Sequence, residues 1–243
     1  MTIEREFHFT YFRAWAELLV SVVLFTGSAC SQDIVAGNRS VQPTISIQQL
    51  MVPAKAEKEL EKAKAAFQKG EYAISKAYVE KALERYPGYA VALVLRGIMN
   101  KGEHKLDLAR MDLERAINSD PGLGLSYVVL AGVHNDQANF QEADKTIKHA
   151  LSLGEVSWRT YYEAARAAAG NHDVGSALFH IRKAQELGPS KIPEIHLMKA
   201  YILVLAGKPK QAIPVLKHVL SIDPSGPCSE KARSLLAELQ VQK

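Results

Sequence analysis

A 34-residue periodicity of small residues runs through most of this 243-residue chain and constrains its fold more than any other feature. Three columns of small residues recur at this spacing, with one step of 35 before the last copy. The first column is Ala63, Gly97, Ala131, Ala165 and Ala200. The second is Ser75, Ala109, Ala143, Ala177 and Ala212, and the third is Ala82, Ala116, Ala150, Ala184 and Val219. A fixed period of this size is typical of a stacked helical repeat.

Each 34-residue repeat contains two stretches with a helical pattern. Apolar residues recur three and four positions apart over roughly 12 to 15 residues, which is the helical period. Proline ends the second stretch in four copies, because it cannot continue a helix and restricts the residue before it. These prolines are Pro87, Pro121, Pro189 and Pro224. We therefore expect an all-α fold of stacked helix-turn-helix units, with residues 225–243 as a capping helix.

Together these features resemble the tetratricopeptide repeat family, whose units are helix-turn-helix pairs of about 34 residues. The resemblance also includes the Gly70-Glu71-Tyr72 turn and the Tyr86-Pro87 ending of the first copy. It implies a right-handed superhelical solenoid of about five repeats over residues 53–224. The expected repeats cover residues 56–89, 90–123, 124–157, 158–192 and 193–226.

Several positions depart from the repeat pattern. Ser75 and Val219 stand in alanine columns, so we expect looser packing in the first and last units. Pro214 falls inside the second helix of the fifth unit and should bend it. The third unit ends on Gly154-Glu155 where the others have proline, so the chain should leave that helix in a different direction.

The first 30 residues do not share the repeat. An apolar run from Leu18 to Phe25 is followed by Gly27-Ser28-Ala29 and then Cys30. A run of this length matches the core of a signal peptide and is short for a membrane span. The small residues before Cys30 resemble the lipobox of bacterial lipoproteins, although Gly27 stands where that family prefers an aliphatic residue. The resemblance implies a signal peptide over residues 1–29 and a lipid attached to Cys30.

Two other interpretations of this terminus stay open. One is ordinary secretion into the periplasm with cleavage after Ala29, and the other is an uncleaved anchor or a cytoplasmic protein. Residues 30–52 are polar and are predicted to form a flexible tether. On the lipoprotein interpretation the protein faces the periplasm from a membrane of the bacterial cell envelope. Ser31 stands where an aspartate would retain a lipoprotein at the inner membrane, which favours the outer membrane.

Motifs and composition argue against an enzyme. The chain has no Gly-rich phosphate loop, no Gly-x-Ser-x-Gly sequence and no His-x-x-x-His pair. Its net charge of +4 is modest and does not indicate a nucleic-acid partner. Its two cysteines, Cys30 and Cys228, provide no disulfide framework. We predict no catalytic residue, no metal site and no cofactor.

In the tetratricopeptide family the first helix of each unit lines a concave groove that holds an extended peptide or a partner helix. The resemblance implies that this chain binds a partner through the residues in the matching register. They are Phe67, Val94, Ile98, Val128, Asn135, Arg159, Tyr162, Arg166 and Tyr201. Around Tyr162 the set combines a rigid aromatic ring with two cations, and such residue types are favoured at binding hot spots.

The leading functional prediction is a non-enzymatic scaffold in the cell envelope that recruits protein partners through this groove. A second prediction is a binder of anionic glycans or lipid headgroups, because seven Lys and Arg residues lie between His180 and His218 against two glutamates. A third is an accessory subunit that docks a separate enzyme.

Overall fold

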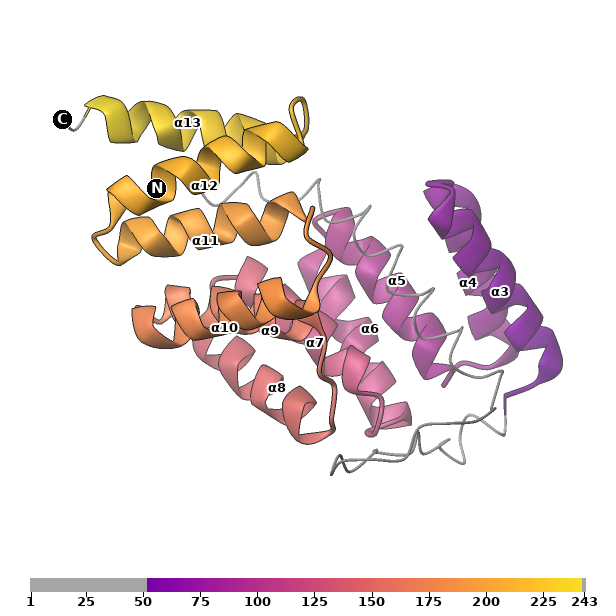
Figure 1. The fold of residues 1–243 in the computed structure, drawn as a ribbon. Helices are drawn as coiled ribbons and strands as arrows, with labels where there is room; N and C mark the ends of the chain where they lie inside the picture. The colour runs from indigo at the N-terminus through magenta and orange to yellow at the C-terminus, as the bar shows by residue number, and fades with distance from the viewer. Residues whose placement is uncertain (1–51, 242–243) are drawn as a thin grey trace, which may run out of the picture. The chain divides into compact units, whose positions relative to one another are not determined.

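The computed structural model describes residues 52–241, and this part of the chain folds into eleven α-helices with no strand (Figure 1). The chain divides into two compact units, one ending at Gly122 and the other beginning at Leu123. Their described parts, residues 52–122 and 123–241, are called here the N-terminal unit and the C-terminal unit. The predicted signal peptide, Cys30 and nearly all of the tether lie outside the described residues.

The N-terminal unit consists of two helix pairs. The first pair is α3 (Ala54–Gln68) with α4 (Tyr72–Arg85). The second is α5 (Ala90–Gly102) with α6 (Leu106–Ser119). Each pair meets at its small-residue columns, where Ala63, Ala82, Ala109 and Ala116 are wholly buried. This close approach of helix backbones is what the small columns predict.

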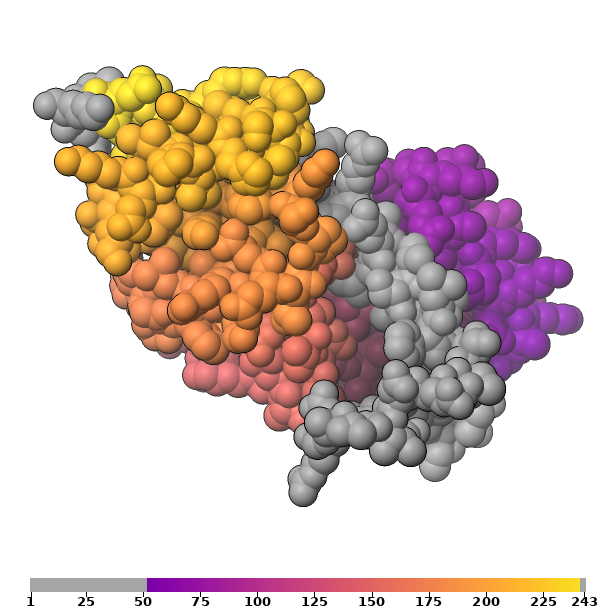
Figure 2. Space-filling model, viewed as in Figure 1, coloured from indigo at the N-terminus to yellow at the C-terminus, as the bar shows by residue number. Residues whose placement is uncertain are grey.

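The C-terminal unit contains three further pairs and a final helix. The pairs are α7 (Gly124–Asp136) with α8 (Phe140–Ser152), α9 (Trp158–Gly170) with α10 (Val174–Leu187), and α11 (Pro193–Leu205) with α12 (Pro209–Ile222). The final helix, α13 (Pro227–Val241), buries Cys228, Ala232, Leu235 and Leu239 against the core of α11 and α12. Figure 2 shows the side chains of these last three helices as one continuous surface. The predicted all-α architecture of helix pairs with a capping helix is confirmed.

The turn inside every pair has the same backbone geometry. One residue in each turn adopts a left-handed conformation with φ between 58° and 77°. These residues are Gly70, His104, Ala138, His172 and Gly207. In each case the next backbone N–H donates to a carbonyl near the end of the first helix, as Asn139 does to His134 at 2.8 Å. This arrangement satisfies carbonyls that a helix end leaves unpaired. Only two of the five positions are glycine, so the sequence signalled this geometry only in part.

The departures from the repeat pattern have different structural outcomes. Ser75 and Val219 are fully buried, like the alanines of their columns, and looser packing in the first and last units stays a prediction. The Ser75 hydroxyl donates to the Ala63 carbonyl at 2.8 Å, which satisfies the one polar group that serine adds to the column. Pro214 lies inside α12, and that helix continues to Ile222.

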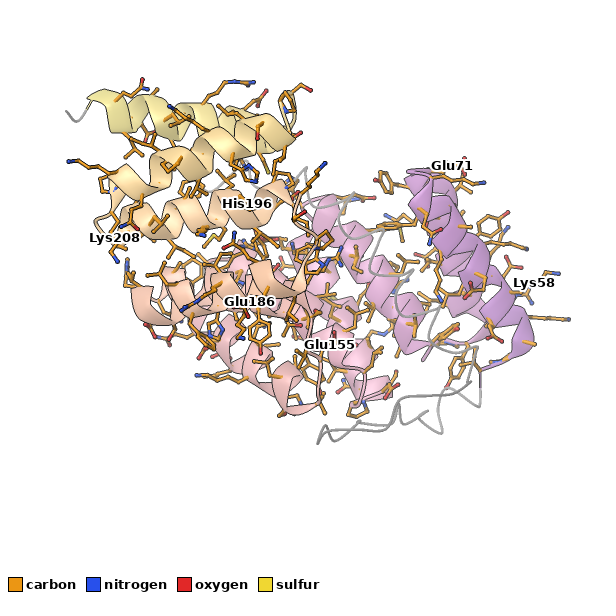
Figure 3. All side chains as sticks on the ribbon, in the orientation of Figure 1. Lys58, Glu71, Glu155, Glu186, His196 and Lys208 are labelled. Carbon is orange, nitrogen blue, oxygen red and sulfur yellow. The ribbon has the colours of Figure 1, made fainter. Side chains whose placement is uncertain are left out.

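Glu155, which stands in the proline column, packs against the start of α7. A Cβ added at Gly124 would lie 2.8 Å from the Glu155 Cβ, so the glycine makes room for this side chain. Burial raises the pKa of the Glu155 carboxyl above its ordinary value, although a hydrogen bond with Ser157 opposes the shift. Figure 3 labels Glu155 among the side chains of this unit.

Candidate functional site

A buried polar network joins α7 and α9, the first helices of two successive pairs in the C-terminal unit. The Asn135 Nδ2 group donates to the Glu163 carbonyl oxygen at 3.0 Å and to Glu163 Oε2 at 2.8 Å. Arg166 donates from Nη1 to the same Oε2 at 3.0 Å. It also donates from Nη2 to Asp136 Oδ1 at 2.8 Å. Four polar side chains from two helices are therefore held in one fixed arrangement.

Burial makes this network energetically important. The side chains of Asp136 and Glu163 are 0% and 2% exposed, and that of Arg166 is 12% exposed. Charged groups at such burial are stable only when they are paired and hydrogen-bonded, because desolvation disfavours an isolated charge. Two carboxylates converge on the Arg166 guanidinium, which supplies that compensation.

The Asn135 amide is satisfied on one side only. Its Oδ1 atom is buried and accepts no hydrogen bond, while the donor side of the same amide is used by Glu163. A buried acceptor without a donor costs about 1 to 3 kcal/mol. The charges of the network are thus paired, but the Asn135 side-chain carbonyl still lacks a donor.

Aromatic and cationic side chains occupy the beginning of α9. The Ser157 hydroxyl caps this helix by accepting from the Thr160 N–H at 3.3 Å. The Arg159 guanidinium lies over the Trp158 ring at 4.3 Å from its centroid, and the Tyr162 ring meets Trp158 edge-on at 6.5 Å. These contacts hold Arg159 and Tyr162 in defined positions on the helix.

Glu194, at the start of α11, has a carboxyl whose pKa is shifted by its surroundings in the same unit. Burial raises the pKa of its carboxyl above the ordinary value, and the charge of Asp223 acts in the same direction. Arg159 opposes that shift. The carboxyl is therefore easier to protonate than an exposed glutamate, and the nearby cation only partly offsets its desolvation.

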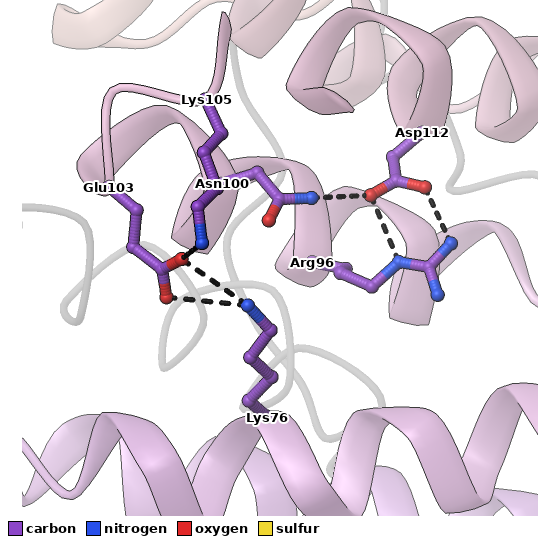
Figure 4. Close-up of polar contacts among 6 residues, drawn as sticks. All are labelled: Lys76, Arg96, Asn100, Glu103, Lys105 and Asp112. Carbon is purple, nitrogen blue, oxygen red and sulfur yellow. Dashed lines mark hydrogen bonds and ion pairs between the residues drawn. The ribbon is translucent and has the colours of Figure 1, made fainter. Parts of the chain in front are cut away.

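The N-terminal unit has a polar network of a different kind. Arg96 on α5 donates to both carboxylate oxygens of Asp112 on α6, at 2.9 and 2.6 Å (Figure 4). Asn100 donates to Asp112 at 2.9 Å, and Arg96 also donates to Glu80 of α4 at 2.9 Å. Separately, Glu103 accepts from Lys76 and Lys105. These contacts join helices α4, α5 and α6 and stabilise their packing.

The predicted groove residues fall into three structural situations. Phe67, Val94, Ile98 and Val128 are at most 3% exposed, and Phe67 packs edge-on against Tyr72 of its own helix pair. Asn135, Arg159, Tyr162 and Arg166 lie at the network and the Trp158 cluster described above, and the first three of them are 4%, 6% and 3% exposed. Partner binding by these residues stays a prediction.

Tyr201 is the remaining predicted groove residue, and it lies on α11 near the capping helix. It is half-buried and packs against the core shared by α11, α12 and α13. Burial raises the pKa of its hydroxyl to about 12, with a smaller contribution from Glu238 of α13. Four of the nine predicted groove residues thus lie at the α7–α9 network and the Trp158 cluster, and a fifth, Val128, is buried on α7.

Glu163 is the network residue that sequence reasoning missed. Its position three residues before Arg166 could have suggested a pair on one helix face. No local pattern indicates its hydrogen bonds with Asn135, which is 28 residues away in the chain. Between residues 52 and 241, no group of three or more His, Cys, Asp or Glu side chains is arranged to hold a metal ion. In the same range no helix combines the length and the apolar character that crossing a membrane requires.

Comparison with known proteins assigns the repeat. The tetratricopeptide repeat family matches residues 193–225, which contain α11 and α12. No curated protein matches the chain in sequence. Solved structures match the fold at low identity. TTC0263, a thermophilic tetratricopeptide repeat protein of Thermus thermophilus, is 16% identical with a TM-score of 0.64, over 75% of this chain and 99% of that chain.

Two other solved structures have the same fold. MamA from Desulfovibrio magneticus RS-1 is 15% identical with a TM-score of 0.56, over 72% of this chain and 98% of that chain. YrrB, described as a tetratricopeptide repeat protein with an unusual peptide-binding site, is 17% identical with a TM-score of 0.52, over 74% of this chain and 92% of that chain. The family model thus identifies one tetratricopeptide repeat, at residues 193–225, and the solved structures show that the chain shares the fold of tetratricopeptide repeat proteins.

Proposed function

We propose that this protein is a non-enzymatic scaffold that binds a peptide segment of a partner protein along α7 and α9. The observation that carries the proposal is the set of polar, aromatic and cationic side chains that α7 and α9 hold in fixed positions, from the Asn135–Glu163–Arg166 network to the Trp158 cluster. Arg166, whose side chain is 12% exposed, offers guanidinium N–H groups to main-chain carbonyls of a bound peptide. Main-chain hydrogen bonds of this kind provide affinity, and neighbouring side-chain contacts provide specificity.

The surroundings of Asn135 support peptide binding. Tyr162 and Trp158 are aromatic residues held in place by mutual contact, and Arg159 is fixed over the Trp158 ring. Rigid aromatic and Arg side chains lose little conformational entropy when a partner binds. The peptide-binding site named for YrrB, which has the same fold, agrees with this class of function.

Site-specific photocrosslinking in the full-length protein tests the proposal. A photoreactive phenylalanine replaces Tyr162, and a matched probe replaces Phe179, which is 47% exposed on α10. We expect one dominant protein adduct from position 162 and none of the same mass from position 179. The adduct should be lost in Asn135→Ala and retained in Asn139→Ala, whose side chain is exposed. Circular dichroism checks that each variant is folded. Equal adducts from both probes, or an adduct that survives Asn135→Ala, would contradict the proposal.

We also propose that the scaffold is tethered to the bacterial cell envelope through a lipid on Cys30, with the outer membrane favoured. The support is the apolar run Leu18 to Phe25 followed by small residues and Cys30. Stable anchoring requires more than one acyl chain or a second attractive surface. Metabolic labelling with a fatty-acid analogue should mark the wild type and leave Cys30→Ser unlabelled. Labelling of both, or of neither, contradicts lipidation at this residue.

A further inference from the structure

The second helices of the three pairs in the C-terminal unit share an outward face that the groove proposal does not use. Each of α8, α10 and α12 buries one apolar or small triplet toward its neighbours. The triplets are Ala143, Ile147 and Ala150, then Ala177, Ile181 and Ala184, and finally Ala212, Leu216 and Val219. Residues one or two positions after the middle of each triplet point away from the buried side of the helix.

Two adjacent basic residues follow the middle of every triplet. They are Lys148 and His149 on α8, Arg182 and Lys183 on α10, and Lys217 and His218 on α12. We call these six residues the basic face. All but Lys183 are exposed, and the Lys183 side chain is 42% exposed. The spacing of 34 and 35 residues places each doublet at the same position of its repeat.

The charges of these helices differ from those of the corresponding helices in the N-terminal unit. Helices α8, α10 and α12 contain six Lys and Arg residues against three Asp and Glu residues. Helices α4 and α6 contain five of each, and the doublets there become Glu80-Lys81 and Glu114-Arg115. The basic excess therefore belongs to one unit and arises from the same repeat position.

Local acids neutralise part of the basic face. Lys148 pairs with Asp144 at 2.6 Å, and Lys183 pairs with Glu186 at 2.8 Å. Among the residues that the structure describes, Arg182 and Lys217 make no ion pair. Figure 3 shows Glu186 on α10, on the same helix as Arg182 and Lys183. The positive charge that remains available lies mainly on α10 and α12.

Exposed apolar side chains accompany these cations. Phe179 and Leu187 on α10 are 47% and 48% exposed. Phe179 precedes the Arg182-Lys183 doublet by three and four residues, and Leu187 follows Lys183 by four, so both lie on the face of the doublet. Leu153, at the end of α8, follows His149 by four residues and is 37% exposed. Such a combination of cations with Phe and Leu is typical of surfaces that rest in the interface of a membrane.

We propose that the basic face docks on an anionic lipid surface, with its cations at the headgroups and Phe179 and Leu187 in the interface. A lipid surface accepts both kinds of side chain at once and needs no complementary pocket. The attraction acts over about a Debye length and weakens with salt. This proposal does not rest on peptide binding by α7 and α9, because it uses different helices of the unit.

Vesicle co-sedimentation of the full-length protein tests the proposal. The probes are vesicles of phosphatidylcholine alone and of equimolar phosphatidylcholine and phosphatidylglycerol. The test variant is Arg182→Ala with Lys183→Ala. The control is Lys81→Ala with Arg115→Ala, which removes two cations from the same repeat position of the N-terminal unit. We expect binding to the anionic vesicles to weaken about fivefold for each cation removed from α10, and little change in the control.

A second variant separates the lipid surface from other anionic partners. Phe179→Ser leaves every charge in place and should weaken binding to anionic vesicles. Equal binding by the α10 double variant and its control overturns the proposal. Equal binding to vesicles with and without phosphatidylglycerol also overturns it. Tight binding of an acidic peptide, with no anionic vesicle binding, also overturns it and assigns the face to an acidic protein segment.

Discussion

The two units contain similar polar networks that join different sets of helices. In the N-terminal unit Arg96, Asn100 and Asp112 join the two helices of one pair, and Asp112 accepts three hydrogen bonds. In the C-terminal unit Asn135, Glu163 and Arg166 join the first helices of two successive pairs. The first arrangement uses the carboxylate fully, whereas the second leaves Asn135 Oδ1 without a donor. The same three residue types, Arg, a carboxylate and Asn, therefore form different hydrogen-bond arrangements in the two units. Their positions on the helices decide which polar atoms find partners.

The largest expected effect follows from removing the acid of the N-terminal network. Asp112→Ala should lower the free energy of unfolding by about 3 kcal/mol, because Arg96 and Asn100 remain largely buried without their main acceptor. Glu114→Ala, on the same helix, is the control, since its pair with Arg110 is exposed and should contribute less than about 1 kcal/mol. Chemical denaturation measures both. A loss for Asp112→Ala no larger than that of the control would show that this network does not stabilise the unit.

A glycine contact in the C-terminal unit gives the next effect. A Cβ at Gly170 would run into the Phe140 ring, so Gly170→Ala should destabilise by about 1 to 3 kcal/mol through overpacking. In the N-terminal unit a Cβ at Gly97 would lie 3.0 Å from the Leu113 Cγ. Because that side chain can shift, and alanine favours a helix by about 1 kcal/mol over glycine, Gly97→Ala should be close to neutral. If Gly170→Ala and Gly97→Ala shifted the denaturation midpoint by the same amount, this expected difference would be contradicted.

The turns predict effects of opposite sign in the two units. Ala138 has a φ of 58°, a conformation that glycine adopts without strain, so Ala138→Gly should stabilise the C-terminal unit by about 1 kcal/mol. Gly70 has a φ of 77° and open space where a Cβ would lie, so Gly70→Ala should destabilise the N-terminal unit by a similar amount. Amide hydrogen exchange locates each change in its unit. Changes of the same sign would mean that contacts outside the turn dominate.

The smallest effect is a pH dependence confined to the C-terminal unit. The His196 ring of α11 lies near Gln185 of α10 and the Ser190 carbonyl, and meets His218 of α12 edge-on at 4.7 Å (Figure 3). Burial lowers the pKa of His196, with smaller contributions in that direction from His218 and Lys199, while the Ser190 carbonyl opposes the shift. Burial also lowers the pKa of His180.

The sign of this dependence follows from the lowered pKa values. The unfolded chain binds the protons more readily, so the histidine contribution to stability is fully present above an ordinary pKa of about 6.5. It is lost as the pH falls through that value toward the folded-state pKa. We expect hydrogen exchange in α10 to α12 to accelerate over this range, and to accelerate less in His196→Gln. Exposed His104, on the N-terminal unit, provides the control as His104→Gln. An identical pH response in both variants would exclude His196 as the cause.

Local sequence was enough to predict most helices and the residues where they meet. Ala109, Ala143 and Ala177 recur at a fixed spacing because close helix packing demands a small side chain at each crossing. The left-handed turns were harder to predict. Glycine marks Gly70 and Gly207, but His104, Ala138 and His172 adopt the same conformation because the hydrogen bonds of the turn require it.

By itself the sequence determined the repeat, the helix pairs and the basic doublets, since each follows a period that can be recognised without knowledge of contacts. Only the tertiary structure decided what individual side chains do. Glu163 accepts from Asn135 across 28 residues, Ser75 donates its hydroxyl to the Ala63 carbonyl, and seven of the nine predicted groove residues are at most 6% exposed. The physical reason is that burial and hydrogen bonding depend on the side chains that neighbouring helices present. A period specifies which helix faces meet, but not which polar atoms find partners there.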